Sequence, residues 1–184
     1  MRSVALITTG GTIEKTYDEA SGVLDNRRSI VHRMLRRLRL EGTAVNVVEL
    51  MHKDSQHMTD ADRERIAEAV RAMAGVAAGD DRITDDSLAG VVVSHGTDTL
   101  GLTGEHLLAA FPEPRVPIVL TGAMRPFEMK QSDALQNLTE AIFAARTLAP
   151  GVYCVAHGRA LAFPGVRKDR DRGTFVKDEA SVKS

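Results

Sequence analysis

The chain has 184 residues, of which 43% are hydrophobic and 4% aromatic, and its formal net charge is −1. The length fits one domain of ordinary size. The balanced charge argues against a nucleic-acid binder, which needs a basic surface to neutralise phosphates, and the absence of tryptophan disfavours a base-stacking platform.

The single cysteine, Cys154, excludes an internal disulfide and a metal site made of several cysteines. It lies in the apolar run VYCVA, which predicts a small buried side chain and not a nucleophile. The apolar run near the N-terminus is too short for a secretory signal, and no segment approaches the length that spans a membrane. We therefore expect a cytoplasmic protein with no membrane partner.

Short β-branched runs alternate with helical patterns along the chain. In residues 28–40, Ile30, Met34 and Leu38 repeat every four positions, which predicts an amphipathic helix that ends near Gly42. The other predicted helices cover residues 61–77, 102–111 and 132–147. Strands are predicted at residues 3–8, 43–51, 90–95, 116–124 and 151–158.

This alternation predicts one α/β domain, residues 1–184, with a mostly parallel sheet flanked by helices on both faces in a Rossmann-like arrangement. Ligands of such sheets bind outside the carboxyl ends of the strands. The loops to consider are therefore 9–17, 53–60, 94–99 and 122–126. The polar and charged segment 169–184 is expected to be a loosely held tail.

The glycines in these loops do not match a nucleotide site. After Gly10 and Gly11 no third glycine opens a helix at the dinucleotide spacing, and no loop contains the Gly-Lys-Ser/Thr of a P-loop. The Gly-x-Ser-x-Gly of a serine hydrolase is absent as well. The loops are instead rich in hydroxyl side chains, among them Thr12, Ser55 and Thr97.

A threonine beside glycines at a strand end presents its hydroxyl next to free backbone N–H groups. This combination suits nucleophilic attack on a carbonyl and stabilisation of the oxyanion that forms. A threonine hydroxyl is a weak nucleophile unless a base takes its proton. Tyr17 in the first loop, or a lysine whose pKa is lowered by its surroundings, has suitable chemistry.

Three strand-end motifs, TTGGTIEK at residues 8–15, SHGTDT at 94–99 and TGAMRP at 121–126, resemble the asparaginase and glutaminase family of the bacterial type. The resemblance extends from Val4 to Phe175. It implies the fold of the asparaginase N-terminal domain. It also implies hydrolysis of the side-chain amide of L-asparagine, and in some members of L-glutamine, through a covalent acyl-threonine ester without a cofactor.

The resemblance implies five catalytic residues. Thr12 matches the first, nucleophilic threonine of the family, and Tyr17 resembles the loop tyrosine that assists it. Thr97 and Asp98 match the second threonine and its aspartate, which faces the substrate α-amine. Lys168, in the segment GVRKDRD, is similar in placement to the lysine that completes a threonine, lysine and aspartate triad.

The resemblance also implies residues that bind the substrate. Ser55 and Gln56 look like the pair that holds the α-carboxylate and the α-amine. Gly11 and Gly96, together with the amide of the second threonine, are implied to contact the oxyanion, and Ala123 to offer a backbone carbonyl near the substrate amide. A free amino acid needs donors for its carboxylate and an acceptor for its ammonium, and these residue types provide both.

Taken singly, these residues have simpler structural roles. A threonine at a strand end can be a turn residue, and a Thr-Asp pair can cap the helix that follows. Lys168 stands in a charged segment, where a lysine is usually solvated. His52, His57 and His95 suggest a metal site, but they form no helical i, i+4 pair, so we expect ordinary hydrogen bonding and no metal.

Typical family members carry a second, smaller C-terminal domain that lends residues to the neighbouring subunit's site. This sequence resembles the rarer short form made of the first domain only. We expect a homo-oligomer, a dimer or tetramer, in which a partner subunit closes the pocket. Three functions stay open: an L-asparaginase, the ammonia-producing component of a tRNA-dependent amidotransferase, and a catalytically silent amino-acid-binding module.

Overall fold

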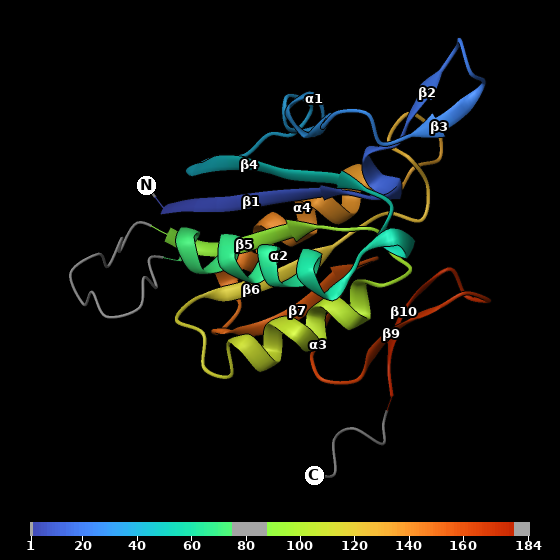
Figure 1. Ribbon diagram of the computed structural model, residues 1–184. Coiled ribbons are helices and arrows are strands. Elements are labelled where there is room, and N and C mark those ends of the chain that lie inside the picture. Colours follow the sequence, from blue (N-terminus) through green and yellow to red (C-terminus); the bar gives the residue numbers. More distant parts are fainter. Residues whose placement is uncertain (1, 75–87, 179–184) are drawn as a thin grey trace.

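A six-stranded sheet forms the centre of the computed structural model, which describes residues 2–74 and 88–178 (Figure 1). The strand order is β4-β1-β5-β6-β7-β8. The first five of these strands run parallel, and β8 is antiparallel to β7. Their bounds are Arg2–Gly10 for β1, Thr43–Lys53 for β4, Leu88–Ser94 for β5, Pro117–Thr121 for β6, Gly151–Ala156 for β7 and Arg159–Ala162 for β8.

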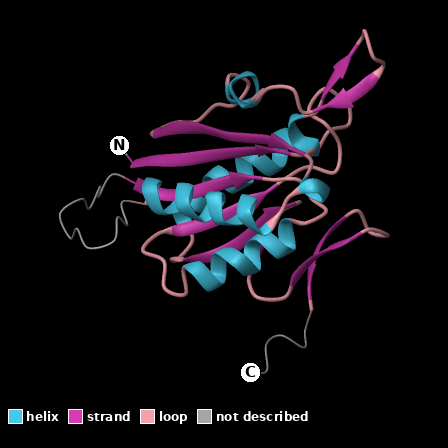
Figure 2. Cartoon of the chain, in the orientation of Figure 1, coloured by secondary structure: helices cyan, strands magenta, loops and turns pink. Residues whose placement is uncertain are grey.

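Helices cover both faces of the sheet (Figure 2). Alternate side chains of β1 enter two separate cores, Ala5 and Ile7 on one face and Val4 and Leu6 on the other. Residues of α2 (Asp60–Met73) and α3 (Leu100–Ala110) belong to the first core. Residues of α1 (Val31–Leu35) and α4 (Ala134–Thr147) belong to the second. The predicted α/β fold with a doubly covered, mostly parallel sheet is confirmed.

The helix predicted over residues 28–40 is much shorter in the structure. Only Val31–Leu35 is helical, and turns follow it. Arg36 and Arg37 follow Arg33 by three and four positions, where like charges destabilise a helix. Arg33 and Arg37 instead place their guanidinium groups over the ring of Phe127. The regular spacing of apolar residues at 28–40 therefore indicates which positions are buried, but it does not indicate how long the helix is.

Two hairpins outside the main sheet were not predicted. β2 (Thr16–Asp18) pairs with β3 (Val23–Asp25), and β9 (Val166–Asp169) pairs with β10 (Thr174–Lys177). The expectation of a loose tail from residue 169 is therefore wrong for residues 174–177, because β10 is paired and Phe175 is buried in the core. Residues 179–184 of that expected tail, and residues 75–77 of the second predicted helix, lie outside the described residues.

Within the described residues, no helix is long and apolar enough to cross a membrane. The same residues hold no cluster of three or more His, Cys, Asp or Glu side chains arranged to bind a metal ion.

Candidate active site

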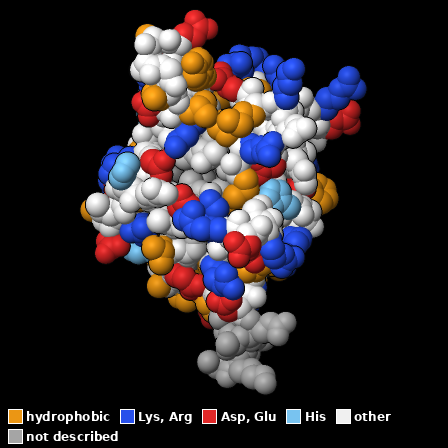
Figure 3. All heavy atoms as spheres, turned by 90° about the vertical axis from the view of Figure 1, so that its right-hand side faces the viewer, with side chains coloured by type: hydrophobic (Ala, Val, Ile, Leu, Met, Phe, Trp, Pro, Cys, Tyr) orange, Lys and Arg blue, Asp and Glu red, His pale blue; other side chains and the backbone are white. Residues whose placement is uncertain are grey.

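The loops that follow β1, β5 and β6 meet at one edge of the sheet. These strands are parallel neighbours, so their carboxyl ends point the same way, toward the right-hand side of Figure 1. Figure 3 looks onto this edge and shows Lys and Arg side chains around a central hollow. All three motifs that carry the family resemblance end at this edge.

The two threonine loops touch through glycines. Gly11 has φ 80° and ψ −178°, a conformation that essentially only glycine adopts. A Cβ atom on Gly11 would stand 2.4 Å from the Cα atom of Gly96, and one on Gly96 would stand 2.5 Å from Oγ of Ser55. The loops of Thr12 and Thr97 are thus packed backbone against backbone, and the side chain of Ser55 packs against Gly96, which brings the segments of Thr12, Ser55 and Thr97 together.

Four of the residues expected at the site form one polar cluster. Nζ of Lys168 donates to Oγ1 of Thr97 at 2.7 Å and to Oδ1 of Asp98 at 2.9 Å. Nε2 of Gln56 donates to the other carboxylate oxygen of Asp98 at 2.7 Å. Burial raises the pKa of Asp98, but the hydrogen bonds from Lys168 and Gln56 outweigh it, so this pKa lies below its ordinary value. Asp98 is therefore ionised at neutral pH.

Neither Thr97 nor Asp98 caps the helix that follows. The helix α3 begins at Leu100, and its N-cap residue Thr99 directs its hydroxyl to the carbonyl of Ser55 at 2.8 Å. The alternative in which the Thr-Asp pair is only a capping signal is therefore wrong. The side chain of Asp98 is instead committed to Lys168 and Gln56.

The hairpin β9–β10 carries Lys168 to the strand ends. Gly101 of α3 packs so closely on this hairpin that an added Cβ atom would stand 2.6 Å from the carbonyl oxygen of Val166. Glu105 of α3 accepts a hydrogen bond from the amide of Gly165 at 2.7 Å. These contacts fix the base of β9, two residues before Lys168, against the helix that follows Thr97.

The side chains of Thr12 and Tyr17 form no hydrogen bond with this cluster. Thr12 is half-buried and opens a short 3-10 turn, Thr12–Glu14, and its hydroxyl makes no hydrogen bond to any described residue. Tyr17 lies on β2 and is 58% exposed. Its hydroxyl reaches across its own hairpin, 3.9 Å from where a Cβ atom of Gly22 would stand. The structure does not bring the Tyr17 hydroxyl to the polar cluster.

The expected oxyanion contact from Gly11 needs a correction. Its N–H donates to the carbonyl of Lys53 at 3.0 Å, because the end of β1 stays paired with β4, and so it is already engaged. The amides of Gly96 and Thr97 donate to no acceptor within the described ranges. These two N–H groups are therefore available to an oxyanion at this edge.

The buried side chain of His95 joins the loop of Thr97 to the helix α3. Burial lowers its pKa to about 4, so the ring is neutral. Nδ1 lies 2.8 Å from the carbonyl oxygen of Gly96, which can only accept, so Nδ1 carries the proton. Nε2 then accepts from the hydroxyl of Thr103 at 2.8 Å. The expectation of ordinary hydrogen bonding is confirmed for this histidine.

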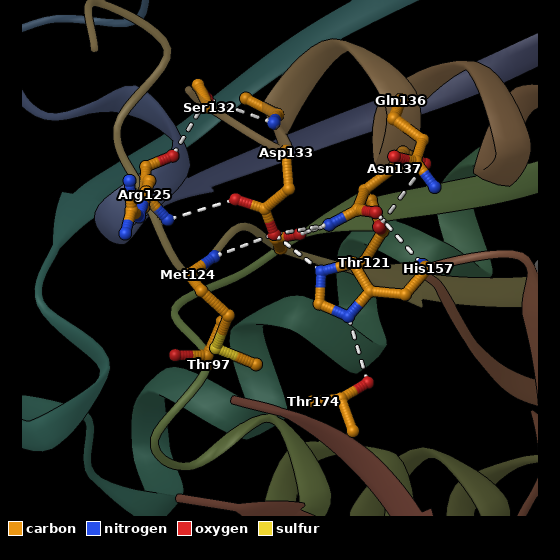
Figure 4. A network of polar contacts seen from close by, with 12 residues as sticks. Thr97, Thr121, Met124, Arg125, Ser132, Asp133, Gln136, Asn137, His157 and Thr174 are labelled. Atoms are coloured by element: carbon orange, nitrogen blue, oxygen red, sulfur yellow. Dashed lines mark hydrogen bonds and ion pairs between the residues drawn. The ribbon is translucent and has the colours of Figure 1, made fainter. Parts of the chain in front are cut away.

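A network around Asp133 holds the loop after β6 (Figure 4). Its carboxylate accepts from the amides of Met124 and Arg125, both at 3.0 Å, and lies 2.7 Å from Nε2 of His157. Nδ1 of His157 lies 2.8 Å from the hydroxyl of Thr174 on β10. The network thus connects the loop of Ala123 to the hairpin of Lys168. Sequence reasoning missed it, because its members are far apart along the chain.

Glu14 is a buried carboxyl in the same short turn as Thr12. It is 1% exposed, and neither side-chain oxygen forms a hydrogen bond within the part of the chain that the structure describes. Thr8, at a position of β1 that is paired with Ser94 of β5, also buries a hydroxyl without a partner. Burial raises the pKa of Glu14 to about 7 and outweighs the opposite effect of the nearby Ser29, Ile30 and Ser94.

We expect Glu14 to make stability depend on pH. Unfolded glutamate titrates near 4.5. Below that pH both states hold the proton, whereas above 7 the folded state carries a buried negative charge, which costs about 3 kcal/mol. The free energy of unfolding of Glu14→Gln minus that of the unsubstituted chain should therefore be about 3 kcal/mol larger at pH 8 than at pH 4. Urea unfolding at the two pH values measures this difference, and the exposed substitution Glu19→Gln is the control. A difference that is the same at both pH values contradicts the assignment.

Comparison with known proteins decides the family. A model described as the N-terminal asparaginase domain matches residues 3–174. The chain belongs to the asparaginase family. An L-asparaginase from Thermococcus kodakarensis is 30% identical over 148 residues, which cover 80% of this chain and 42% of that protein. A component of the glutamyl-tRNA(Gln) amidotransferase from Methanococcus vannielii is 28% identical over 165 residues, which cover 86% of this chain and 35% of that component.

Solved asparaginase structures share the fold. The thermostable L-asparaginase from Thermococcus kodakarensis superposes with a TM-score of 0.77 at 27% identity, over 95% of this chain and 51% of that one. L-asparaginase I from Vibrio cholerae gives a TM-score of 0.75 at 24% identity, a likeness of fold alone. The chain spans about half the length of these solved asparaginases and less than half of both sequence relatives.

Proposed function

We propose that this protein hydrolyses the side-chain amide of L-asparagine to L-aspartate and ammonia. The observation that carries the proposal is the contact of Lys168 Nζ with Thr97 at 2.7 Å and with Asp98 at 2.9 Å, beside the loop of Thr12. A lysine that touches a buried hydroxyl and an ionised carboxylate suits proton transfer. Membership of the asparaginase family and the L-asparaginase relative support amide chemistry.

In the first step, Oγ1 of Thr12 attacks the side-chain amide carbon of the substrate. Its proton passes to the pair of Lys168 and Asp98, in which Lys168 gives a proton to the Asp98 carboxylate as it accepts the one from Thr12, while the free amides of Gly96 and Thr97 stabilise the oxyanion. The C–N bond then breaks, and the nitrogen takes a proton from the same pair and leaves as ammonia. An aspartyl ester of Thr12 remains.

In the second step, water replaces the threonine. Thr97 and Lys168 take a proton from the water, and the resulting hydroxide attacks the ester carbon. The ester bond breaks, Thr12 regains its proton and L-aspartate leaves. We assign the α-amine of the substrate to Asp98 and Gln56, and its α-carboxylate to Ser55, as the family resemblance implies. The family resemblance implies that Tyr17 assists Thr12, but in this structure the Tyr17 hydroxyl lies away from the polar cluster. We therefore propose that the loop of Tyr17 moves over the bound substrate.

A second candidate function is the ammonia-producing component of an amidotransferase. The relative from Methanococcus vannielii, which is named as part of such an enzyme, favours it. In that case a partner protein would receive the ammonia, and turnover by this chain alone would be slow.

We also propose that a second copy of the chain closes the site. Tyr17, Val23 and Met129 are large apolar side chains that stay 58%, 51% and 44% exposed. They gather where the hairpin β2–β3 meets the loop after β6, since the amide of Tyr17 bonds to Glu128. The cytoplasmic location of the protein stays a prediction.

Ammonia release by the purified chain tests the proposed function. We expect equal amounts of ammonia and L-aspartate from L-asparagine, and a slower reaction with L-glutamine run in parallel. Release that begins only when an amidotransferase partner is added would favour the second candidate. No release from either amide, with binding of L-aspartate retained, would overturn the proposal in favour of a silent binding module.

A further inference from the structure

Two cations share one oxygen of Asp98. Its Oδ1 atom lies 2.9 Å from Nζ of Lys168 and 2.8 Å from a guanidinium nitrogen of Arg170. Its Oδ2 atom accepts the hydrogen bond from Gln56. A carboxylate that is to receive a substrate ammonium therefore already carries two positive partners and one neutral donor.

The two cations are held very differently. The side chain of Lys168 is 18% exposed and is also bonded to Thr97, so it is fixed on two sides. The side chain of Arg170 is 69% exposed, and Asp98 is its single ion-pair partner among the described residues. An exposed ion pair of this kind is weak and exchanges readily with solvent. Arg170 is therefore the partner that another cation can displace.

A second acceptor lines a cavity beside Asp98. Asp98, Lys168 and Arg170 line a cavity of ≈ 290 Å³ whose wall also includes Glu105 of α3. Glu105 uses one oxygen for the amide of Gly165 and keeps lone pairs for a further donor. Arg170 can thus leave Asp98 without losing access to a carboxylate.

We propose that Arg170 is a specificity-determining residue that occupies the place of the substrate ammonium on Asp98. This inference rests on the proposed function, because it takes Asp98 as the acceptor of the α-amine. A ligand with an ammonium must displace Arg170, and the two cations repel each other if both stay. A ligand without an ammonium has no such competitor. Arg170 thus weakens the binding of amino acids relative to their deamino analogues.

The test compares Arg170→Ala with Arg172→Ala. Arg172 is the matched control, because it is an exposed arginine in the turn of the same hairpin and does not line the cavity. Calorimetry gives the Kd of each chain for L-aspartate and for succinate, its analogue without the amino group, and the KM for L-asparagine is measured on the same samples. For Arg170→Ala we expect the Kd for L-aspartate and the KM to fall about five-fold. The Kd for succinate, and all constants of Arg172→Ala, should stay unchanged.

The outcomes separate this inference from the proposed function. A Kd for L-aspartate that is unchanged or higher in Arg170→Ala overturns the role of Arg170, even when ammonia release is normal. Equal changes for L-aspartate and succinate also overturn it, because they indicate a general effect on the pocket. If the chain releases no ammonia but Arg170→Ala binds L-aspartate more tightly, the proposed function fails while the displacement by ammonium holds.

Discussion

Thr12→Ala is expected to lower the rate of ammonia release from L-asparagine by at least about 10³-fold. The substitution removes a hydroxyl at this edge that is bonded to no described residue, on a residue that is half-buried. It leaves the Lys168 cluster intact, because Thr12 takes no part in those hydrogen bonds. The loss should therefore appear in kcat, while the Kd for L-aspartate changes little.

Thr12→Ser is the matched control for this substitution. It retains a hydroxyl on the same turn and should keep measurable turnover. Both variants lack the methyl group of threonine, so if Thr12 were needed only for packing, both should lose turnover to a similar extent. Near-normal ammonia release by Thr12→Ala would show that Thr12 is a turn residue and would move the nucleophile elsewhere.

Lys168→Met is expected to lower kcat by about 10²- to 10⁴-fold, the range typical of general acid-base catalysis. Methionine keeps much of the apolar stem but cannot exchange a proton with Thr97. The fold should survive, since Asp98 keeps Gln56 and Arg170 as partners and is not left as an unpaired buried charge. We therefore expect a melting temperature close to that of the unsubstituted chain together with a large loss of turnover.

Lys177→Met provides the comparison for Lys168→Met. Lys177 lies on β10 of the same hairpin, but its Nζ donates to the carbonyl of Ala162, away from Thr97. Its kcat should stay close to the unsubstituted value, because its amine touches none of the groups proposed to move protons. Equal losses in the two variants would mean that the hairpin, and not the amine of Lys168, matters for turnover.

The sequence was most informative where one residue type serves one purpose. Continuous apolar runs such as residues 4–7 identified the buried parallel strands, because a strand covered on both faces has no polar side. Glycines at strand ends identified the loops that pack together, as Gly11 and Gly96 do. The doubly covered sheet and the edge that carries the candidate site followed from these two signals.

The sequence was least informative where contacts depend on residues far apart. The hairpin β9–β10 lies in a charged segment without an apolar period, so no local pattern predicts it. Its contacts with Gly101 and Glu105 hold it in place. The contact of His157 with Asp133 joins positions 24 residues apart and has no local pattern. The ion pair of Arg170 with Asp98 is likewise visible only in three dimensions.

The covalent intermediate tests the central claim most directly. A Thr97→Ala chain retains Thr12 but lacks the hydroxyl proposed to activate water, so the acyl group should accumulate. After acid quenching during turnover of L-asparagine, peptide mass spectrometry should find one aspartyl group on the peptide that carries Thr12. An aspartyl group on the Thr97 peptide of a Thr12→Ala chain, with none on Thr12 in the Thr97→Ala chain, would contradict the account and make Thr97 the nucleophile.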